Sequence, residues 1–477
     1  MARPRSQRIY GLETEFGCLV EDEASRPEIA VEIIKDAIFT EMRLGALDIH
    51  SRDEVFEPAE SGGFLINGAR LYIDAVGSHL EYATAECQDL KTLVANDRAG
   101  QRQIVRALEE TGLRDTVNVY NNSVDHFGGH TFGCHEDFFT GKVAFLYPFL
   151  VTRQIFSGVG RVGGHILFEG GRPDYADLAS NPVDYIWVSN IYNVQPDPDV
   201  EFQLSQRADH ILKTVASRVR FNRALVNPKW EHFYSHDGMH RLHLLFGEAN
   251  QNQFAYALKV GTTSLVLALI EDELVPEELL VAQPLTALRQ VSRDPDWKWP
   301  VRMLDGSTMG AVDLQREYLK LAERYREDSE DAAWILDQWA AILDGLESDP
   351  MALGDRIDWV AKRKIVEMYR ESERLEWSDD ALHSIDLEYH NIDPQKSLFQ
   401  AYQATEPVRD FVDDLDITDA MTDPPTNTRA LGRSKLVQKV VQSKKHDFYM
   451  FDWSGASLGR DEHIELHDPF ETYADVT

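Results

Sequence analysis

The segment GLETEFG places two acidic side chains at a spacing that suits metal or phosphate chemistry. If residues 11–17 form a strand, Glu13 and Glu15 share one face, because side chains alternate along a strand. Two carboxylates side by side repel each other and need a metal, a basic residue or water to compensate. A solvent-facing pair on an edge strand is the plain alternative.

The segment RLYID, followed by a Gly-Ser turn, offers a second set of such side chains. Arg70, Tyr72 and Asp74 fall at i, i+2 and i+4, so a strand projects all three from one face. Arg provides a phosphate clamp, Tyr an oxygen ligand and Asp a base, and Glu81 follows across the turn. Mg²⁺ prefers carboxylate oxygens and substrate phosphates. A half-exposed strand of an antiparallel sheet is the alternative, and the acids of the first segment weaken it.

Two further segments add cationic and imidazole side chains. In RLHLLF, Arg241 and His243 share a strand face, which fits a phosphoryl site on a sheet lined with acids. A single strand histidine is more often structural. In GCHED, His135 and Glu136 are adjacent and point oppositely, so we expect at most one of them to face the site.

The letters GVGRVG at residues 158–163 match the spacing of a dinucleotide-binding loop. That motif requires a strand before it and a helix after it. Here a strand-like HILFE follows and is broken by Gly and Pro, so we do not expect a Rossmann site.

Composition limits the class of protein and its partners. The chain has 477 residues and a formal charge of −33, so we expect one large and one smaller domain and no binding of nucleic-acid phosphates. Acidity favours basic partners or exposed lysines, although it also serves solubility. We expect no signal peptide and no membrane span, and three scattered cysteines indicate a reducing cytoplasm rather than a disulfide framework or a zinc site.

Periodicity predicts a mixture of strands and helices. The expected strands are residues 7–20, 70–76, 81–86, 116–121, 240–247 and 447–453. The expected helices are residues 29–42, 91–112, 252–272, 313–328, 331–347, 355–373 and 429–443. We expect irregular structure in a loop at 46–66, a surface excursion at 169–200 and an acidic linker at 405–427.

Several of these segments, taken in order along nearly the whole chain, resemble the family of prokaryotic ubiquitin-like protein (Pup) ligases and depupylases. The shared motifs are GLETEFG, NGARLYID, GSHLEYATAEC, YPFLVTRQIFSGVGRV, QLSQRADH, RLHLLFGEAN, LKVGTTSLVLALIE, IDWVAKRK, IDLEYHNI, FDW and HDPF. The resemblance implies an α+β fold with a glutamine-synthetase-like large domain, an antiparallel sheet cradle with helices. We place this domain at residues 1–405 and a small C-terminal domain at 406–477.

The resemblance also implies a mechanism. ATP phosphorylates the γ-carboxylate of the C-terminal glutamate of a small modifier, and a target lysine then attacks to form an isopeptide bond. By motif position, Glu13, Tyr72 and Glu81 are implied as Mg²⁺ ligands, and Asp74 as the base that deprotonates the lysine. Arg70, Thr84 and Trp453 are implied as ATP contacts. We add His243 as a metal ligand, and Arg241 and Lys229 as phosphate contacts; strand parity does not explain Thr84.

Departures from the family pattern keep other activities open. One extra residue lies between Asp74 and Glu81, and Lys229 and Trp230 stand where the family has Arg and Asp. Lys lacks the bidentate geometry of Arg toward phosphate. The gap before NGARLY favours the ligase branch. The alternatives are a phosphotransferase acting on another acceptor, a depupylase or deamidase, and a non-enzymatic binding protein.

Overall fold

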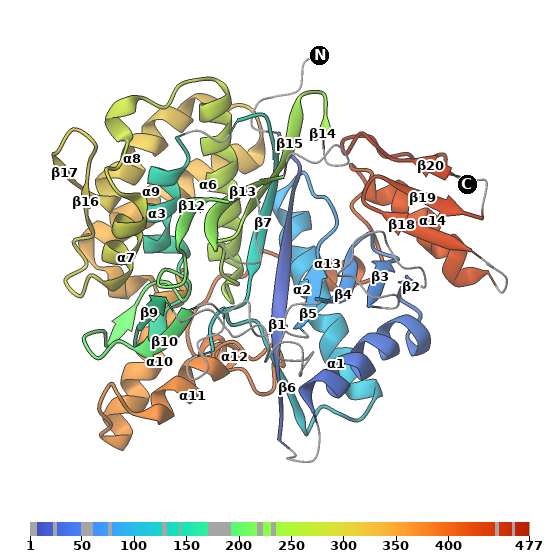
Figure 1. Cartoon of the computed structure of the whole chain (residues 1–477), viewed down its shortest axis with the longest axis horizontal. Coiled ribbons are helices and arrows are strands. Elements are labelled where there is room, and N and C mark those ends of the chain that lie inside the picture. Colours follow the sequence, from blue (N-terminus) through green and yellow to red (C-terminus); the bar gives the residue numbers. More distant parts are fainter. Residues whose placement is uncertain are drawn as a thin grey trace.

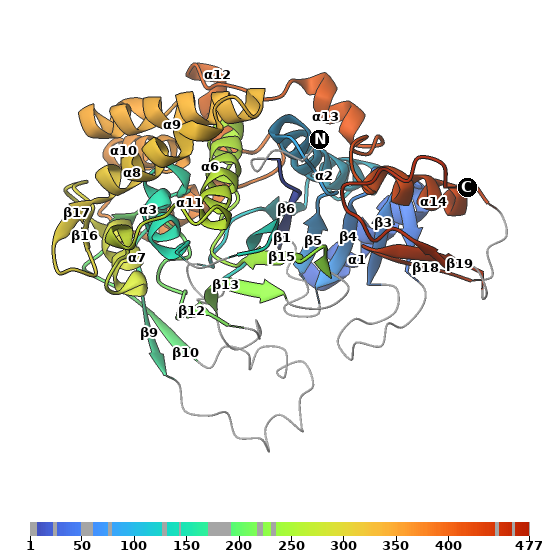
Figure 2. The same ribbon diagram turned by 90° about the horizontal axis from the view of Figure 1, so that it is seen from above.

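The computed structural model of the chain describes most of its residues and places one large sheet at their centre (Figure 1). Most helices gather on one side of this sheet, and a smaller sheet near the C-terminus lies at its far edge (Figure 2). The described residues are 7–21, 26–48, 61–74, 79–125, 131–142, 145–169, 192–216, 223–229, 235–443, 448–459 and 463–476.

The large sheet is antiparallel throughout except for one pair of strands. Its strands are β1 (Tyr10–Val20), β2 (Gly45–Leu47), β3 (Gly62–Leu65), β4 (Arg70–Asp74), β5 (His79–Ala83), β6 (Val117–Tyr120), β7 (Cys134–Thr140), β12 (Lys213–Val215), β13 (Ala224–Lys229), β14 (Ser235–His236) and β15 (Met239–Leu244). The order across the sheet is β12-β13-β15-β7-β1-β5-β4-β3-β2, with β6 beside β1 and β14 beside β15. Among the described strands of this sheet, only β12 and β13 run parallel.

The remaining elements form helical layers and small sheets. The helices are α1 (Pro27–Asp36), α2 (Leu90–Glu110), α3 (Tyr147–Ser157), α6 (Gln253–Glu271), α7 (Pro284–Arg293), α8 (Ala311–Ala322), α9 (Glu330–Ser348), α10 (Asp358–Glu373), α11 (Asp380–Glu388), α12 (Leu398–Thr405), α13 (Asp414–Ala420) and α14 (Ala430–Gln442). A π-helical turn (Ala37–Glu41) and short 3-10 helices (Glu277–Leu279, Glu323–Tyr325, Pro350–Leu353) accompany them. The smaller strands are β8 (Arg161–Val162), β9 (His165–Glu169), β10 (Tyr192–Pro196), β11 (Phe202–Gln203), β16 (Pro300–Arg302), β17 (Thr308–Gly310), β18 (Tyr449–Asp452), β19 (Gly455–Leu458) and β20 (His463–Glu465).

Alternation along the strands separates an apolar face from a polar one. Leu12, Phe16, Leu71 and Leu80 are almost fully buried and belong to the clusters that contain residues of α1, α2 and α6. Because successive strand residues point to opposite faces, Glu13 and the residues two positions away from it on the same strand point away from this core. The helices therefore cover one face of the sheet and leave the acidic side chains on the other.

The C-terminal residues form a compact unit on the edge of the sheet. Strands β18, β19 and β20 pair with one another, and α14 packs its apolar side chains against them. Phe64 of β3 and Ala46 of β2 belong to the same buried cluster. This unit thus shares its core with the edge strands of the large sheet, and the boundary at residue 405 stays a prediction.

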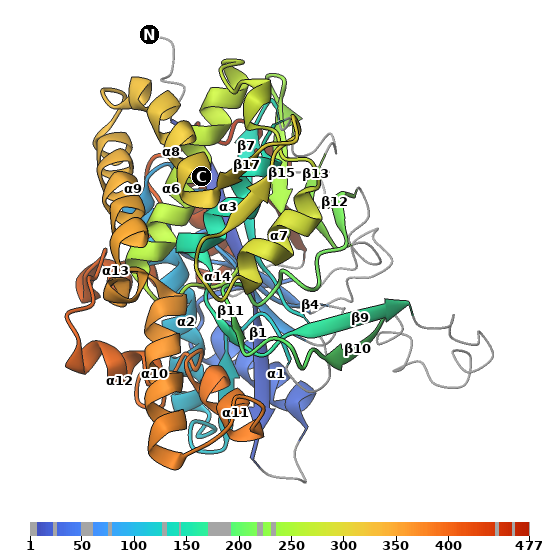
Figure 3. The same cartoon turned by 90° about the vertical axis from the view of Figure 1, so that its left-hand side faces the viewer.

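Most expected elements are present, and the differences are short or local. The expected loop at 46–66 is wrong at both ends, where β2 and β3 pair with each other, and residues 49–60 lie outside the described residues. The acidic linker contains α13, which Asp413 caps by accepting from the amide of Asp416. The excursion at 169–200 falls mainly outside the described residues, but β10 pairs with β9 in a hairpin that projects from the body (Figure 3).

Helix α6 is apolar and long enough to cross a membrane by length and composition alone. In the fold it is the central core helix, with 94% of its apolar window buried. Because α6 is buried in the fold, its apolar composition is that of a core helix and gives no support to a membrane span.

Candidate active site

The register of β1, β5 and β4 brings the predicted acidic residues side by side. Glu15 lies opposite Glu81, and Glu81 lies opposite Tyr72 on its other side. Residues directly opposite in an antiparallel pair project to the same face. The shared face predicted from alternation in the two segments is therefore confirmed, and it extends across three strands.

The first cluster on this face contains only carboxylates. Oxygen atoms of Glu15, Asp74 and Glu81 all lie within 4.8 Å of one another. Burial raises the pKa of Glu81 well above its usual range, and the charges of Glu13, Glu15 and Asp74 raise it further. A hard divalent cation would relieve this repulsion, so the three residues suit Mg²⁺ in donor type and in charge.

Tyr72 borders this cluster as a neutral hydroxyl. Burial, followed by the charge of Glu81, raises the pKa of Tyr72 well above its usual value, so the phenol keeps its proton. The guanidinium carbon of Arg70 lies 4.3 Å from the centre of the Tyr72 ring. Arg70 is itself buried, with 6% of its surface exposed, and so brings a cation to the edge of the carboxylates.

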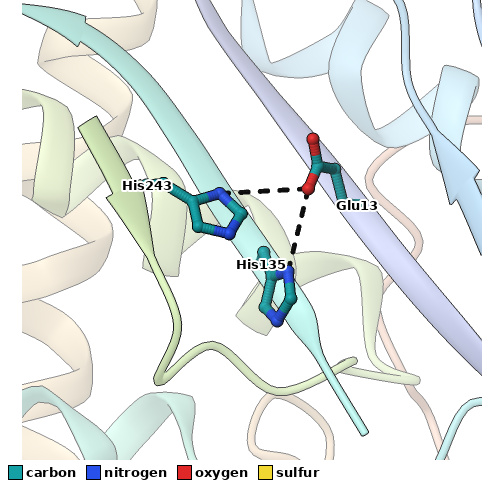
Figure 4. A group of neighbouring side chains, drawn as sticks. All are labelled: Glu13, His135 and His243. Atoms are coloured by element: carbon teal, nitrogen blue, oxygen red, sulfur yellow. Dashed lines mark ion pairs between the residues drawn. The ribbon is translucent and has the colours of Figure 1, made fainter. Parts of the chain in front are cut away.

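The second cluster combines one carboxylate with two imidazoles (Figure 4). Nδ1 of His135 lies 3.7 Å and Nδ1 of His243 lies 3.9 Å from Oε2 of Glu13. The two rings stack edge to face at 4.6 Å between centroids. Glu136 points to the other side of the sheet, where it pairs with buried Arg153, as the opposite orientation of adjacent strand residues predicts.

Arg241 bridges the second cluster and Asp137. Its Nε donates to Oδ1 of Asp137 at 2.7 Å, and its Nη2 donates to Oδ2 at 3.2 Å and also to Glu13. Burial alone would raise the pKa of Glu13, but Arg241 and then the two histidines lower it well below its usual range. The surroundings therefore favour the ionised form of Glu13, whereas those of Glu81 in the first cluster favour its protonated form.

A cavity opens beside these clusters, between the large sheet and the C-terminal unit. Four of the predicted site residues line it, namely Glu13, Thr84, Arg241 and Trp453. This combination is consistent with a nucleotide site. An aromatic ring suits a base, a hydroxyl suits a ribose or a phosphate, and a guanidinium suits a phosphate.

The walls of this cavity are held by specific contacts. Thr84 lies one residue beyond β5, and its Oγ1 accepts from the amide of Leu12 at 3.0 Å. The Trp453 ring packs edge-on against Phe64 at 5.0 Å and lies 4.7 Å from the guanidinium carbon of Arg433. The end of β5 and the C-terminal unit thus reach the cavity from different parts of the sequence.

Lys229 is placed only by its backbone. It pairs with Arg241 across β13 and β15, which puts it on a strand of the site. Its side chain, and Trp230 after it, lie outside the described residues. The phosphate contact expected of Lys229 therefore stays a prediction.

Three residues at the site were not singled out from the sequence. Asp137 lies two positions beyond His135, so the alternation of side chains along a strand could have predicted that both face the site. Arg207 and His79 both influence the charge of Glu15. Arg207 is 4% exposed, and its Nε and Nη1 have no hydrogen-bond partner in the part of the chain that the structure describes. Arg207 belongs to the motif QLSQRADH, which the family resemblance includes, but no local sequence pattern predicts that this loop residue lies near β1.

Comparison with known proteins shows similarity along almost the entire chain. The family model described as Pup-ligase protein matches residues 8–457. A Pup–protein ligase of Acidimicrobium ferrooxidans is 33% identical over 486 residues, covering 98% of this chain and 96% of that protein. A depupylase of Acidothermus cellulolyticus is 35% identical over 410 residues, covering 82% of this chain and 75% of that protein.

Two solved structures share the architecture. The crystal structure of Pup in complex with its ligase PafA gives a TM-score of 0.77 at 28% identity, covering 98% of this chain and 90% of that chain. The structure of PafA in complex with ADP gives a TM-score of 0.72 at 28% identity, covering 95% of this chain and 92% of that chain. The expected α+β fold, a glutamine-synthetase-like antiparallel sheet with helices, is confirmed by this likeness.

Proposed function

The chain belongs to the Pup-ligase family, and from this membership and its site we propose that it is an ATP- and Mg²⁺-dependent ligase. It joins the C-terminal glutamate of a Pup-like modifier to lysines of target proteins. The observation that carries the proposal is the carboxylate cluster of Glu15, Asp74 and Glu81 beside a cavity lined by Thr84, Arg241 and Trp453. Carboxylate–amine ligation needs this combination of a cation site, a nucleotide site and a base.

The nucleotide is held from several strands. Trp453 would pack on the base, Thr84 and Arg70 would contact the nucleotide, and Arg241 would face its phosphates, with Lys229 as a further candidate from its position on β13. Support for ATP comes from the similar PafA structure with ADP. Lys229 would offer a point charge where a guanidinium would bind phosphate with two hydrogen bonds.

The acidic and imidazole groups hold the cation. Glu13, Tyr72, Glu81 and His243 are the proposed ligands. Glu81 belongs to the carboxylate cluster with Glu15 and Asp74, and Glu13 and His243 belong to the second cluster with His135. The charge of Glu13 raises the pKa of Glu81, which supports a cation between the two clusters. Mg²⁺, when bound, neutralises charge that develops on the transferring phosphoryl group. Tyr72 enters as a neutral oxygen donor, because its pKa is raised.

The reaction proceeds in two steps. In the first, an oxygen of the modifier's γ-carboxylate attacks the γ-phosphorus of ATP, and ADP leaves with the electrons of the broken P–O bond. Arg241 and Arg207 supply positive charge to this face of the sheet. Pre-organised cations in a buried site stabilise such a transition state more strongly than cations in water.

In the second step, a neutral lysine amine attacks the acyl carbon of the mixed anhydride, and phosphate leaves as the amide forms. The amine is protonated in water at neutral pH, so a base must accept its proton. Asp74 belongs to the carboxylate cluster and is half-buried at the end of β4. We assign the base to Asp74.

Partners and location follow from the same proposal. The partners are a Pup-like small protein and lysine-bearing targets, and the chain's charge of −33 disfavours nucleic acid and favours exposed lysines. Cysteines 18, 87 and 134 are free thiols, which is consistent with a cytoplasmic location. We assign residues 1–405 to the catalytic domain and 406–477 to the small domain that completes the nucleotide site.

The test is ADP release from Mg·ATP with a Pup-like peptide ending in glutamate and an amine acceptor, with products identified by mass spectrometry. Peptide-dependent ADP release with a new isopeptide mass supports the ligase, and a peptide ending in alanine serves as the control because it has no γ-carboxylate. Hydrolysis of a preformed isopeptide without ligation would move the protein to the depupylase branch. ADP release that ignores the peptide, with a phosphorylated acceptor, would move it to the phosphotransferases.

A further inference from the structure

Asp137 lies on β7 between the strand that carries Glu13 and the strand that carries Arg241 and His243. Its register partners are Gly11 on β1 and His243 on β15. Its side chain is 16% exposed and lines the cavity that we assign to the nucleotide. Asp137 therefore stands at the junction of the proposed nucleotide and cation sites.

The carboxylate holds the Arg241 guanidinium by its side edge. Oδ1 accepts from Nε at 2.7 Å and Oδ2 accepts from Nη2 at 3.2 Å. A bidentate contact of this kind fixes the plane of a guanidinium as well as its position. Nη2 also donates to Glu13, so Asp137 orients the Arg241 guanidinium toward the second cluster.

The same oxygen fixes the ring of His243. Nδ1 of His243 lies 2.9 Å from Oδ1 of Asp137, and the ring is 4% exposed. A neutral imidazole that donates through Nδ1 to a carboxylate carries its lone pair on Nε2, as metal-binding histidines do when a carboxylate orients them.

We propose that Asp137 is a positioning residue that sets the His243 tautomer for a cation and the orientation of Arg241 for a nucleotide phosphate. The inference rests on the proposed ATP-dependent function. It couples the two sites through one carboxylate, so a change at Asp137 weakens cation binding and nucleotide binding together.

Asparagine cannot replace Asp137 in this arrangement. The carboxylate accepts from three N–H groups, two on Arg241 and one on His243. An amide has one acceptor oxygen and one NH₂ donor, so in either orientation the NH₂ faces an N–H of Arg241 or the Nδ1 of His243. At least one of the three hydrogen bonds is lost, and an NH₂ facing His243 favours the wrong tautomer.

The test uses Mn²⁺ as a spectroscopic probe for the cation site and ADP for the nucleotide site, with the full chain and no modifier. We expect D137N to weaken Mn²⁺ binding by ~10–100-fold, the usual effect of removing a residue that orients a metal-binding histidine. ADP binding in the presence of Mn²⁺ should weaken with it. The matched control is E136Q, the neighbouring acid on the opposite face of β7, which loses an ion pair with Arg153 but should leave both affinities unchanged.

A second readout reports the tautomer directly. Two-bond ¹⁵N–¹H spectra of the histidine side chains, with His243 identified by its absence in H243Q, should show the Nδ1–H form in the unmodified chain and its loss in D137N. An Nε2–H form in the unmodified chain would overturn the proposal without any folded variant of Asp137. Equal weakening of Mn²⁺ binding in D137N and E136Q would also overturn it, because general destabilisation would then explain the effect.

These measurements involve no turnover, so they separate the inference from the proposed ligase activity. A chain that forms no isopeptide bond but behaves as expected here would lose the ligase assignment and keep the role of Asp137. A ligase whose D137N variant binds Mn²⁺ and ADP normally would keep its function and lose this inference.

Discussion

Glu15 of β1 and Glu81 of β5 are direct register partners on the polar face of the sheet, Glu15 half-buried and Glu81 buried, and both carboxylates lie within reach of Asp74. Burial would raise the pKa of both, but nearby His135, His79 and Arg207 and the amide of Gly133 lower that of Glu15. The surroundings therefore shift the pKa values of the two carboxyls in opposite directions, so that the ionised form is favoured at Glu15 and the protonated form at Glu81.

The first prediction concerns stability in the absence of divalent cations. Because the pKa of Glu81 is raised in the folded state, the folded chain holds a proton that the unfolded chain has released. Stability therefore falls as pH rises from the ordinary value near 4.5 through the raised folded pKa. E81Q should flatten this fall and raise the free energy of unfolding at pH 8 by on the order of 1 kcal/mol, one unit of pKa shift being worth about that much. Urea unfolding in EDTA between pH 5 and 9 measures it.

Addition of Mg²⁺ provides the control for E81Q. The cation should stabilise the unmodified chain at pH 8 and should stabilise E81Q less, because one carboxylate ligand is gone. An unchanged pH slope in E81Q would show that the proton does not reside on Glu81.

The second prediction tests Asp74 as base. D74N should reduce transfer to an amine by ~10²–10⁴-fold, the usual contribution of general base catalysis, while ADP and Mn²⁺ binding persist. The measurement is isopeptide formation by mass spectrometry beside nucleotide titration. Asp74 also lies within the carboxylate cluster, so loss of Mn²⁺ binding in D74N would reassign it from base to metal ligand.

The third prediction concerns Gly133, which stands directly behind His135. A methyl group at this position would lie 2.1 Å from Nε2 of His135, and the Gly133 amide donates to Glu15. G133A should therefore displace His135 and destabilise the chain by about 1–3 kcal/mol, as overpacking usually does. Thermal unfolding and Mn²⁺ titration measure both effects. G141A is the matched control, because among the described residues its new methyl would meet only a carbonyl oxygen, at 3.9 Å. Equal effects in the two variants would refute the explanation.

Strand alternation predicted the part of the site that depends on local geometry. Glu13 with Glu15, and Arg70 with Tyr72 and Asp74, share a face because the period of a strand is two residues. The same rule separated His135 from Glu136 correctly. These predictions needed no knowledge of which strands are neighbours.

Neighbouring strands and loops could not be predicted in this way. Asp137 meets Arg241 only because β7 lies between β1 and β15, which is a property of the whole sheet. Thr84 fits no alternation because it lies beyond the end of β5, where its hydroxyl accepts from the Leu12 amide. Arg207 reaches Glu15 from a loop, and strands as short as β2 and β3 carry too few residues for a period to show.

The last prediction concerns Glu86, which joins the end of β5 to the C-terminal unit. Its Oε1 accepts from Nε of Arg429 at 2.7 Å and from Nη1 of Arg433 at 3.1 Å. Arg433 also donates to the backbone oxygens of Gly68, at 2.9 Å, and Trp453, at 3.1 Å, so one buried carboxylate supports the wall of the nucleotide cavity. E86A leaves two buried guanidinium groups without this carboxylate, and breaking a buried ion pair costs roughly 3–5 kcal/mol.

Two measurements follow for Glu86. Its pKa is about 2, because Arg433 and Arg429 outweigh the effect of burial, so its contribution is present above the ordinary value near 4.5 and is lost as pH falls toward 2. E86A should remove that part of the acid dependence. It should also accelerate hydrogen exchange in β18–β20 and weaken ADP binding through Trp453. D344N removes an exposed ion pair with Arg316 and should change none of these. Unaltered exchange in β18–β20 of E86A would mean that the shared apolar core of Phe64 and Phe451, rather than Glu86, holds the C-terminal unit in place.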